Sequence, residues 1–184
     1  MKPRILTIAT LFVLLFAALP AFAERGPFVK GMTYRYKDSN LLVSLAVGGA
    51  FDRPDLKEAI LSTRPIRITF TIELVKHRAL WTTKTIVRRK VVHSVVYDNL
   101  TRQFTLETLA DGKSTDQRVV ETMEEVVSYM EQVTDVVVTS VANLDPSEGS
   151  YSLQAQVHLL DDFALWIIPW DVQTPWATQT ISTP

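Results

Sequence analysis

The sequence predicts a mainly β protein, an antiparallel β-sandwich or half-open barrel of about seven strands with two short helices. Two observations lead to this fold class. Six stretches alternate apolar and polar residues with period two, which is the pattern of half-buried strands. Short segments rich in turn-forming residues separate many of these stretches, so neighbouring strands are expected to fold back as hairpins.

The first predicted hairpin pairs residues 32–36 with residues 41–47. The stretch between them, residues 37–40, is Lys-Asp-Ser-Asn and favours a turn. Alternate apolar side chains from both strands then share one face, which we expect to face the core.

The clearest alternation lies in the middle of the chain, where residues 66–74 are expected to pair with residues 84–97. If the chain folds back at residues 81–82, Glu73 lies opposite Lys90 on the outer face. Such an opposite-charge pair stabilises a sheet by about 0.2–1 kcal/mol. A slip of one residue would mix the two faces, so the sequence favours one register.

The same apolar face continues into a third strand. The predicted register places Ile66 opposite Tyr97, and a turn at residues 99–102 then places Tyr97 opposite Phe104. Asp111-Gly112 is a typical hairpin turn and ends the third strand.

Two short helices are expected to cover the sheet. Asp52 and Pro54 suit the start of the first helix. The second starts with the capping-box pattern Thr122-x-x-Glu125, and apolar residues follow at helical spacing over residues 123–133.

The last predicted hairpin pairs residues 136–144 with residues 151–159 through a turn at residues 145–149. In this register Val138 lies opposite Val157. The strand count then reaches about seven, and the sequence leaves the choice between sandwich and half-open barrel open.

The N-terminus has the pattern of a cleaved secretory signal peptide, residues 1–23. Lys2 and Arg4 precede an apolar run, and small residues lead up to Ala23. We therefore predict cleavage between Ala23 and Glu24.

The predicted mature chain, residues 24–184, is interpreted as a single β-rich domain that is periplasmic or secreted. The alternative is an inner-membrane anchor through an uncleaved N-terminal helix. The apolar run, residues 5–19, is shorter than the ~20 residues that a membrane-spanning helix needs, and Pro20 follows it. The chain contains no cysteine, which excludes a lipoprotein anchor and disulfide bonds.

The charge balance argues against nucleic acid as a partner. Without Lys2 and Arg4, 17 of the 19 basic residues remain against 20 acidic residues. A nucleic-acid-binding domain usually carries an excess of basic residues.

The segment Val96–Phe104 resembles the strand–turn–strand signature of a bacterial exported family catalogued as domain of unknown function 4390. Similar features are the basic residues 88–90 before it, the helix start at Thr122, and the turn at residues 143–146. The resemblance covers nearly the whole mature chain, with a looser match over the tail at residues 171–176, where Pro175 departs from the pattern. It implies an exported protein without an assigned activity, and in some genomes members are encoded near membrane sensor kinases.

No catalytic, metal or cofactor motif stands out, so we predict a protein that is not an enzyme and has no cofactor. His77 and His93 are too far apart along the predicted hairpin to share an ion, and His158 lies on a polar face. His93 is expected to be a hydrogen-bonded core histidine near Thr108.

Four residues are candidates for partner binding. Arg88 and Lys90 belong to a basic cluster that suits an acidic partner or lipid headgroup, although such charge also protects sheet edges from aggregation. Trp170 and Trp176 are candidate exposed anchors in the tail, because tryptophan is frequent at binding surfaces.

Three functions follow from these observations. The leading hypothesis is a non-enzymatic periplasmic module that binds an envelope protein or lipid of unknown identity and is linked to envelope signalling. The alternative is an envelope protein that binds a lipid or other hydrophobic small molecule between its β-layers. A hydrolase ranks third, because it requires polar residues scattered in the sequence to converge in one pocket.

Overall fold

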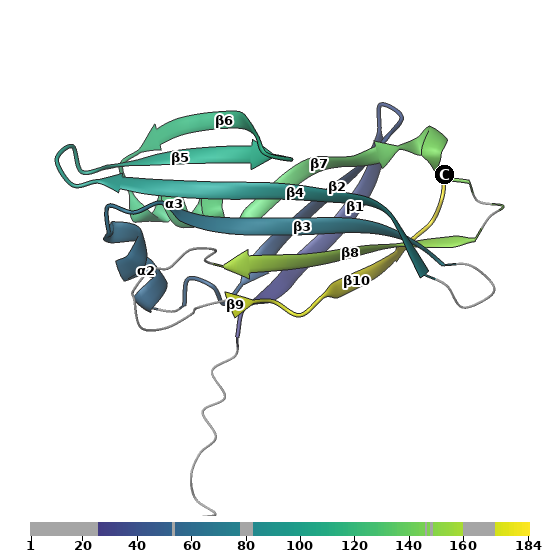
Figure 1. Cartoon of the computed structure of the whole chain (residues 1–184), viewed down its shortest axis with the longest axis horizontal. Coiled ribbons are helices and arrows are strands. Elements are labelled where there is room, and N and C mark those ends of the chain that lie inside the picture. The colour runs from purple at the N-terminus through teal and green to yellow at the C-terminus, as the bar shows by residue number, and fades with distance from the viewer. Residues whose placement is uncertain (1–25, 53, 78–82, 146, 148, 160–171) are drawn as a thin grey trace, which may run out of the picture.

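The structure, a computed structural model, describes residues 26–184 except 53, 78–82, 146, 148 and 160–171 (Figure 1). Within these residues it contains ten strands, two α-helices and one 3₁₀ turn. The strands are β1 (Phe28–Lys37), β2 (Asn40–Gly48), β3 (Ile66–His77), β4 (Thr83–Asp98), β5 (Gln103–Ala110), β6 (Lys113–Val120), β7 (Gln132–Ser140), β8 (Ser150–Leu159), β9 (Val172–Gln173) and β10 (Ala177–Ile181). The helices are α2 (Pro54–Leu61) and α3 (Met123–Met130), and the 3₁₀ turn is η1 (Val141–Asn143). The predicted mainly β, antiparallel fold with two short helices is confirmed.

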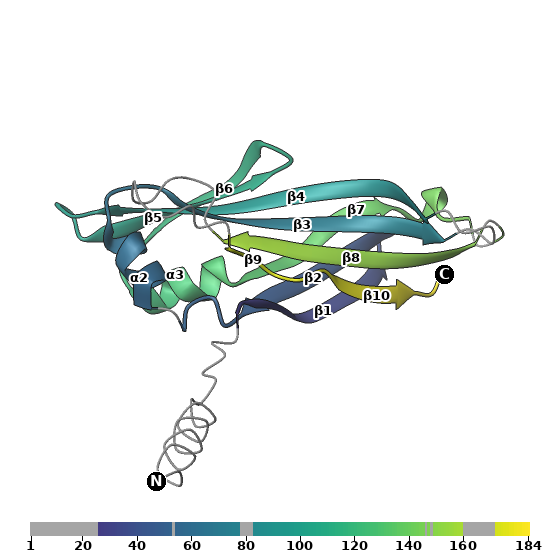
Figure 2. The ribbon, with the colours of Figure 1, turned by 60° about the horizontal axis from the view of Figure 1, so that its bottom comes forward.

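The strands form two antiparallel sheets that face each other across the core. The small sheet has the order β1-β2-β7, and the large sheet has the order β10-β8-β3-β4-β5-β6, with β9 also beside β8. Figure 1 shows the small sheet behind the large one, Figure 2 shows β1 and β2 below it, and both views show the two helices at one end. The central strand β3 supplies four core side chains that are fully buried: Ile68, Phe70, Ile72 and Leu74. The two-layer arrangement is that of a sandwich.

The β1–β2 hairpin has the predicted turn and pairing. Tyr36 lies opposite Leu41 and Tyr34 lies opposite Val43, so these side chains share a face as expected. Asp38 and Ser39 both have positive φ, 50° and 59°, which is the two-residue turn that matches the twist of a hairpin.

The predicted register of β3 and β4 is wrong by two residues. Ile66 lies opposite Val95 rather than Tyr97, and Glu73 lies opposite Arg88 rather than Lys90. The expected tight turn at residues 81–82 falls outside the described residues, and the last pair before that segment is His77 with Thr83. The connection is therefore longer than a two-residue turn. From Ile66 to Leu74 this slip of two residues keeps each side chain on its expected face, so periodicity alone did not reveal the error.

The next turns are confirmed. Tyr97 lies opposite Phe104, as predicted. Asp111 and Gly112 form the next turn with φ of 48° and 82°. Beyond this turn lies β6, a strand that the sequence did not predict because its residues are mostly polar and exposed. It forms the free end of the large sheet.

Helix α3 begins as predicted. The Thr122 side chain accepts a hydrogen bond from the Glu125 backbone N–H, and the Glu125 side chain accepts one from the Thr122 N–H, so the capping box is complete. The helix ends at Met130, earlier than the apolar pattern suggested, and Val133 is a buried residue of β7.

The last predicted hairpin is wrong. β7 pairs with β2 in the small sheet, whereas β8 pairs with β3 in the large sheet. The chain crosses between the sheets after η1, and Leu144 packs in the core on the way. Val138 and Val157 are both buried, as expected, but on opposite sides of the sandwich. Alternation shows which face is buried and does not show which sheet a strand joins.

The C-terminal strands β9 and β10 line up along the outer edge of β8, separated by Thr174, Pro175 and Trp176. Thr174 is 1% exposed, and it bonds to β8 at the point where neither β9 nor β10 pairs with that strand. Its backbone N–H donates to the Val157 carbonyl oxygen, and its Oγ1 accepts a hydrogen bond from the Val157 N–H at 3.0 Å. No helix among the described residues combines the length and apolarity that crossing a bilayer requires.

Candidate functional site

The four predicted partner-binding residues do not form one site. Arg88 and Lys90 are exposed on the outer face of β4, whereas Trp176 lies beside β8 and is 45% exposed. Strands β3 and β8 separate the two positions. Trp170 falls outside the described residues, as do Ala23 and Glu24 of the predicted cleavage site.

Arg88 is engaged within the sheet. Its Nε donates to the Glu73 carboxylate at 2.6 Å, and Thr85 Oγ1 donates to the second Glu73 oxygen at 3.2 Å. The Glu73 side chain is only 7% exposed, whereas that of Arg88 is 60% exposed. A buried carboxylate is costly without an opposite charge, so Arg88 stabilises the fold by pairing with Glu73.

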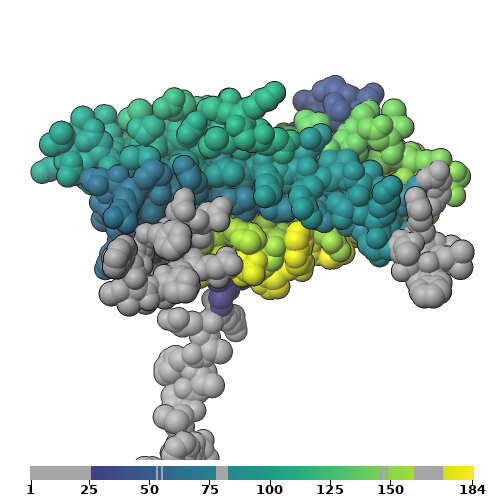
Figure 3. Space-filling model, viewed as in Figure 1, coloured from purple at the N-terminus to yellow at the C-terminus, as the bar shows by residue number. Residues whose placement is uncertain are grey.

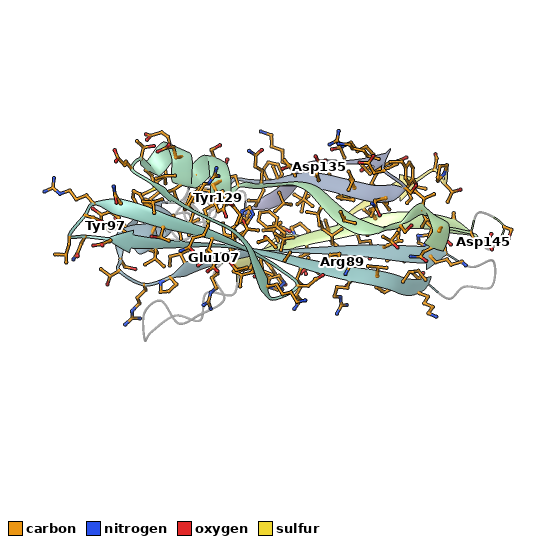
Figure 4. All side chains as sticks on the ribbon, turned by 90° about the horizontal axis from the view of Figure 1, so that it is seen from above. Arg89, Tyr97, Glu107, Tyr129, Asp135 and Asp145 are labelled. Carbon is orange, nitrogen blue, oxygen red and sulfur yellow. The ribbon has the colours of Figure 1, made fainter. Side chains whose placement is uncertain are left out.

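A groove opens between the two sheets, on the side where β6 and β7 end their sheets. Its volume is about 730 Å³. The wall from β4, β5, β6 and the β5–β6 turn consists of residues 89–91, 93, 108, 110, 111, 115, 116 and 118, and the wall from α3 and β7 consists of residues 128, 129 and 132–137. Figure 4 looks onto this side, with Tyr129 and Asp135 labelled on the α3–β7 layer and Arg89 on the β4 layer. We call this feature the β6–β7 groove.

His93 and Tyr129 join the two walls at the base of this groove. His93 Nδ1 donates to the Tyr129 backbone carbonyl oxygen at 2.8 Å, and the two rings stack with centroids 4.5 Å apart. His93 is 5% exposed, and burial lowers its pKa to about 4. The imidazole is therefore neutral at pH 7, with its proton on Nδ1, because a carbonyl oxygen only accepts. The predicted core role of His93, opposite Thr108, is confirmed.

The Tyr129 ring also receives a cation. The Arg118 guanidinium lies 4.4 Å from the ring centroid, and the Tyr129 hydroxyl hydrogen-bonds with Thr108 Oγ1. Burial raises the pKa of Tyr129. The wall at this end of the groove thus presents an aromatic ring held between an imidazole and a guanidinium.

At the opposite end of the groove, Arg89 links β4 to β7 and to the β5–β6 turn. Its Nε donates to the Val138 carbonyl oxygen of β7 at 3.1 Å, and its Nη1 donates to Asp111 at 3.0 Å. On β7, Asp135 accepts from Arg35 at 2.5 and 3.0 Å. Charges of both signs therefore surround the groove, and Val137 on β7 is an exposed apolar residue beside them, at 49%.

A second hollow of about 1030 Å³ lies over the small sheet and α3. Glu131 lines it together with Asp52, Lys30 and Lys57. Burial, together with the nearby Asp52, raises the pKa of Glu131, while the two lysines act in the opposite direction. Its lining residues come mainly from the small sheet and α3, so this hollow is less enclosed by a facing layer than the β6–β7 groove is.

The histidines do not share a site. His77 Nε2 contacts Ser152 Oγ at 2.8 Å, and His77 lies nine residues along β3 from Ile68, which pairs with His93. His158 Nε2 contacts Gln156 Oε1 at 3.3 Å, and His158 pairs with Thr69, the neighbour of Ile68, so its side chain points to the opposite face of the sheet from that of His93. Within the described part of the chain, no group of three or more His, Asp or Glu side chains is placed to hold a metal ion.

Sequence reasoning missed Tyr129, Arg118 and Asp116 as lining residues of the groove. Tyr129 looked like one more position of an amphipathic helix. Arg118 and Asp116 lie on β6, which was not predicted as a strand. The only available signal was their spacing: residues two apart in a strand share a face.

The comparisons with known proteins give one match. No curated protein and no solved structure matches this chain. The family model described as Domain of unknown function (DUF4390) matches residues 27–165, which include both walls of the β6–β7 groove and every strand from β1 to β8. The chain therefore belongs to the DUF4390 family, as its strand–turn–strand signature suggested.

Proposed function

We propose that this protein is a non-enzymatic module of the bacterial envelope that binds an extended polypeptide segment of a partner protein in the β6–β7 groove. The observation that carries the proposal is the groove itself, a hollow of about 730 Å³ between two terminal strands. Its volume lies within the range of about 300–1,000 Å³ that is typical of ligand sites.

The walls favour a polypeptide as the occupant. β7 ends the small sheet, so backbone N–H and C=O groups on its free side are available to an added chain. Val133 and Tyr129 supply apolar surface in the groove, while Arg118 and Asp135 supply charges of opposite sign near its rim. A peptide offers all three kinds of complement at once: amides, apolar side chains and charges.

The sequence supports the location. Residues 1–23 have the pattern of an export signal, and the predicted mature chain has no cysteine and a slight excess of acidic residues. An envelope protein is therefore the expected source of the segment.

The test is a selection of random linear peptides on the purified protein, followed by titration of the selected peptide against variants. Val137→Lys places a charge beside the groove at an exposed position and is expected to weaken binding about tenfold or more. Val119→Lys is the matched control, because Val119 is 57% exposed on β6 and does not line the groove. Equal affinities of the two variants would contradict the groove as the binding site, and a selection that yields no peptide would contradict the proposal as a whole.

The lipid-binding alternative requires a different space. The region between the sheets is filled by side chains such as Phe70, Leu106 and Leu153, each fully buried. An apolar ligand between the layers would have to displace them, at a cost of several kcal/mol for each large side chain moved. Native mass spectrometry of the gently purified protein decides between the two ideas, since a retained lipid would favour the alternative.

A further inference from the structure

Strand β6 is an exposed terminal strand. Its residues from Lys113 to Val119 are all exposed, and β5 is its only neighbour among the strands of the described residues. Figures 1 and 3 show β6 along the margin of the molecule, with no other described segment beyond it in that view. An edge of this kind presents unpaired backbone groups that another strand can use.

The charges along β6 are complementary to themselves when the strand is reversed. In an antiparallel pair centred on Gln117, Asp116 of one copy lies opposite Arg118 of the other, and Arg118 lies opposite Asp116. Lys113 then lies opposite Glu121, the residue that directly follows β6. Two-fold symmetry repeats each pair, so four opposite-charge pairs form.

Other registers lack this match. A shift of two residues in one direction places Asp116 opposite its own counterpart, and a shift of two in the other direction places Arg118 opposite its own. Like charges directly opposite each other are destabilising. A shift of one residue in either direction places Asp116 and Arg118 opposite uncharged residues, so the opposite-charge pairs are lost. The charge pattern thus selects the Gln117-centred register.

We propose that β6 pairs with β6 of a second copy in this register, which joins the two large sheets into one continuous sheet. The pairing uses the outer edge of β6 and does not depend on a peptide in the β6–β7 groove. The planar face of the Arg118 guanidinium contacts the Tyr129 ring, so the N–H groups at its edge can donate to Asp116 of the second copy without breaking that contact.

A cysteine scan tests the geometry in the full chain, which has no cysteine of its own. At the symmetry axis, the two copies of residue 117 have Cα atoms about 4.5–5.5 Å apart, which suits a disulfide. We expect Gln117→Cys to form a covalent dimer under mild oxidation. Val119→Cys is the matched control on the same face, because Val119 lies two residues from Gln117 in the regular part of β6 and its two copies lie about 13 Å apart along the strands. A Val119→Cys chain that cross-links as well as Gln117→Cys would overturn the register.

Charge reversal tests the pairing without a covalent link. Asp116→Arg alone faces Arg with Arg, and Arg118→Asp alone faces Asp with Asp, so each variant is expected to sediment as a monomer. An equimolar mixture restores all opposite charges across the interface and is expected to sediment at twice the monomer mass, which also shows that both variants are folded. A mixture that remains monomeric, or a natural chain that stays monomeric at every concentration, would overturn the proposal and leave the β6 charges as protection of an exposed edge.

Discussion

His93 stacks on Tyr129 with an interplanar angle of 21°, and the same imidazole donates a hydrogen bond to the Tyr129 backbone carbonyl oxygen at 2.8 Å. One side chain of β4 therefore fixes both the backbone and the ring of a residue on α3. Because α3 leads directly into β7, this contact sets the position of one wall of the β6–β7 groove relative to the other.

We predict that this contact makes stability depend on pH. The pKa of His93 is lowered from 6.5 to about 4 by burial, so the unfolded chain binds the proton more readily between these values. The stability that neutral His93 supports is present above pH 6.5 and is lost as the pH falls toward 4, by roughly 3 kcal/mol in all. Urea denaturation at stepped pH measures the change.

The control for this prediction is His93→Gln, which keeps an N–H donor and removes the titration. Its free energy of unfolding should fall less than that of the natural chain over the same pH window. Glu131 acts in the opposite direction, since its raised pKa makes the folded state bind a proton more readily as the pH falls. The difference between the two proteins isolates His93, and parallel curves would contradict the assignment.

The Glu73–Arg88 pair gives a second prediction. Arg88→Ala leaves the buried Glu73 carboxylate with the hydrogen bond from Thr85 and without that from Arg88, and should lower the free energy of unfolding by about 1–3 kcal/mol. Exposure of Arg88 to solvent places the effect toward the lower end. Lys90→Ala removes a neighbouring exposed cation and should change stability by about 0.5 kcal/mol or less. Chemical denaturation of both variants decides whether Arg88 or Lys90 is the partner.

The capping box of α3 gives a third prediction. Thr122→Ala removes the acceptor of the Glu125 N–H and should lower the free energy of unfolding by about 0.5–2 kcal/mol, whereas Thr122→Ser should restore most of it. Thermal unfolding followed by circular dichroism compares the three proteins. Identical midpoints for Thr122→Ala and the natural chain would show that the cap does not limit stability.

Thr174 gives a fourth prediction. Thr174→Val keeps the shape of the side chain and leaves the Val157 N–H without its Oγ1 acceptor, which should lower the free energy of unfolding by about 1–3 kcal/mol. Thr178→Val is the matched control, because Thr178 is exposed on β10. Amide hydrogen exchange at Val157 gives a local readout, and unchanged protection there in Thr174→Val would contradict the role of Oγ1.

Local pairings were predictable from the sequence, because a short turn fixes the register of its two strands. The Asp38-Ser39 turn and the Asp111-Gly112 turn both lie where turn chemistry indicated. Register failed for β3 and β4, where the connection is longer than a tight turn, and a shift between Leu74 and Val75 adds a further offset. From Ile66 to Leu74 the side chains keep their expected faces because the slip is even, whereas from Val75 onward the further offset of one residue changes which side chains lie opposite each other on a face.

Pairings between distant strands were not predictable. The alternation in β7 indicates a strand with a buried face, and its neighbour β8 satisfies the same criterion, yet they belong to different sheets. Strands β6 and β10 escaped notice because few of their side chains reach the core. The groove depends on β6 and on the placement of β7, so the sequence indicated its buried histidine, His93, and did not indicate its walls.

The interleaved strand order has a kinetic consequence. β2 pairs with β7 and β3 pairs with β8, so Leu41 meets Thr139 and Phe70 meets Val157 only after much of the chain is present. Chains dominated by such distant pairings fold slowly, because loop closure precedes the contacts that reward it. For a polypeptide that crosses a membrane with its N-terminus first, neither sheet can close until the C-terminal third has emerged. If residues 1–23 direct export as predicted, both sheets of this chain would close only late in transit.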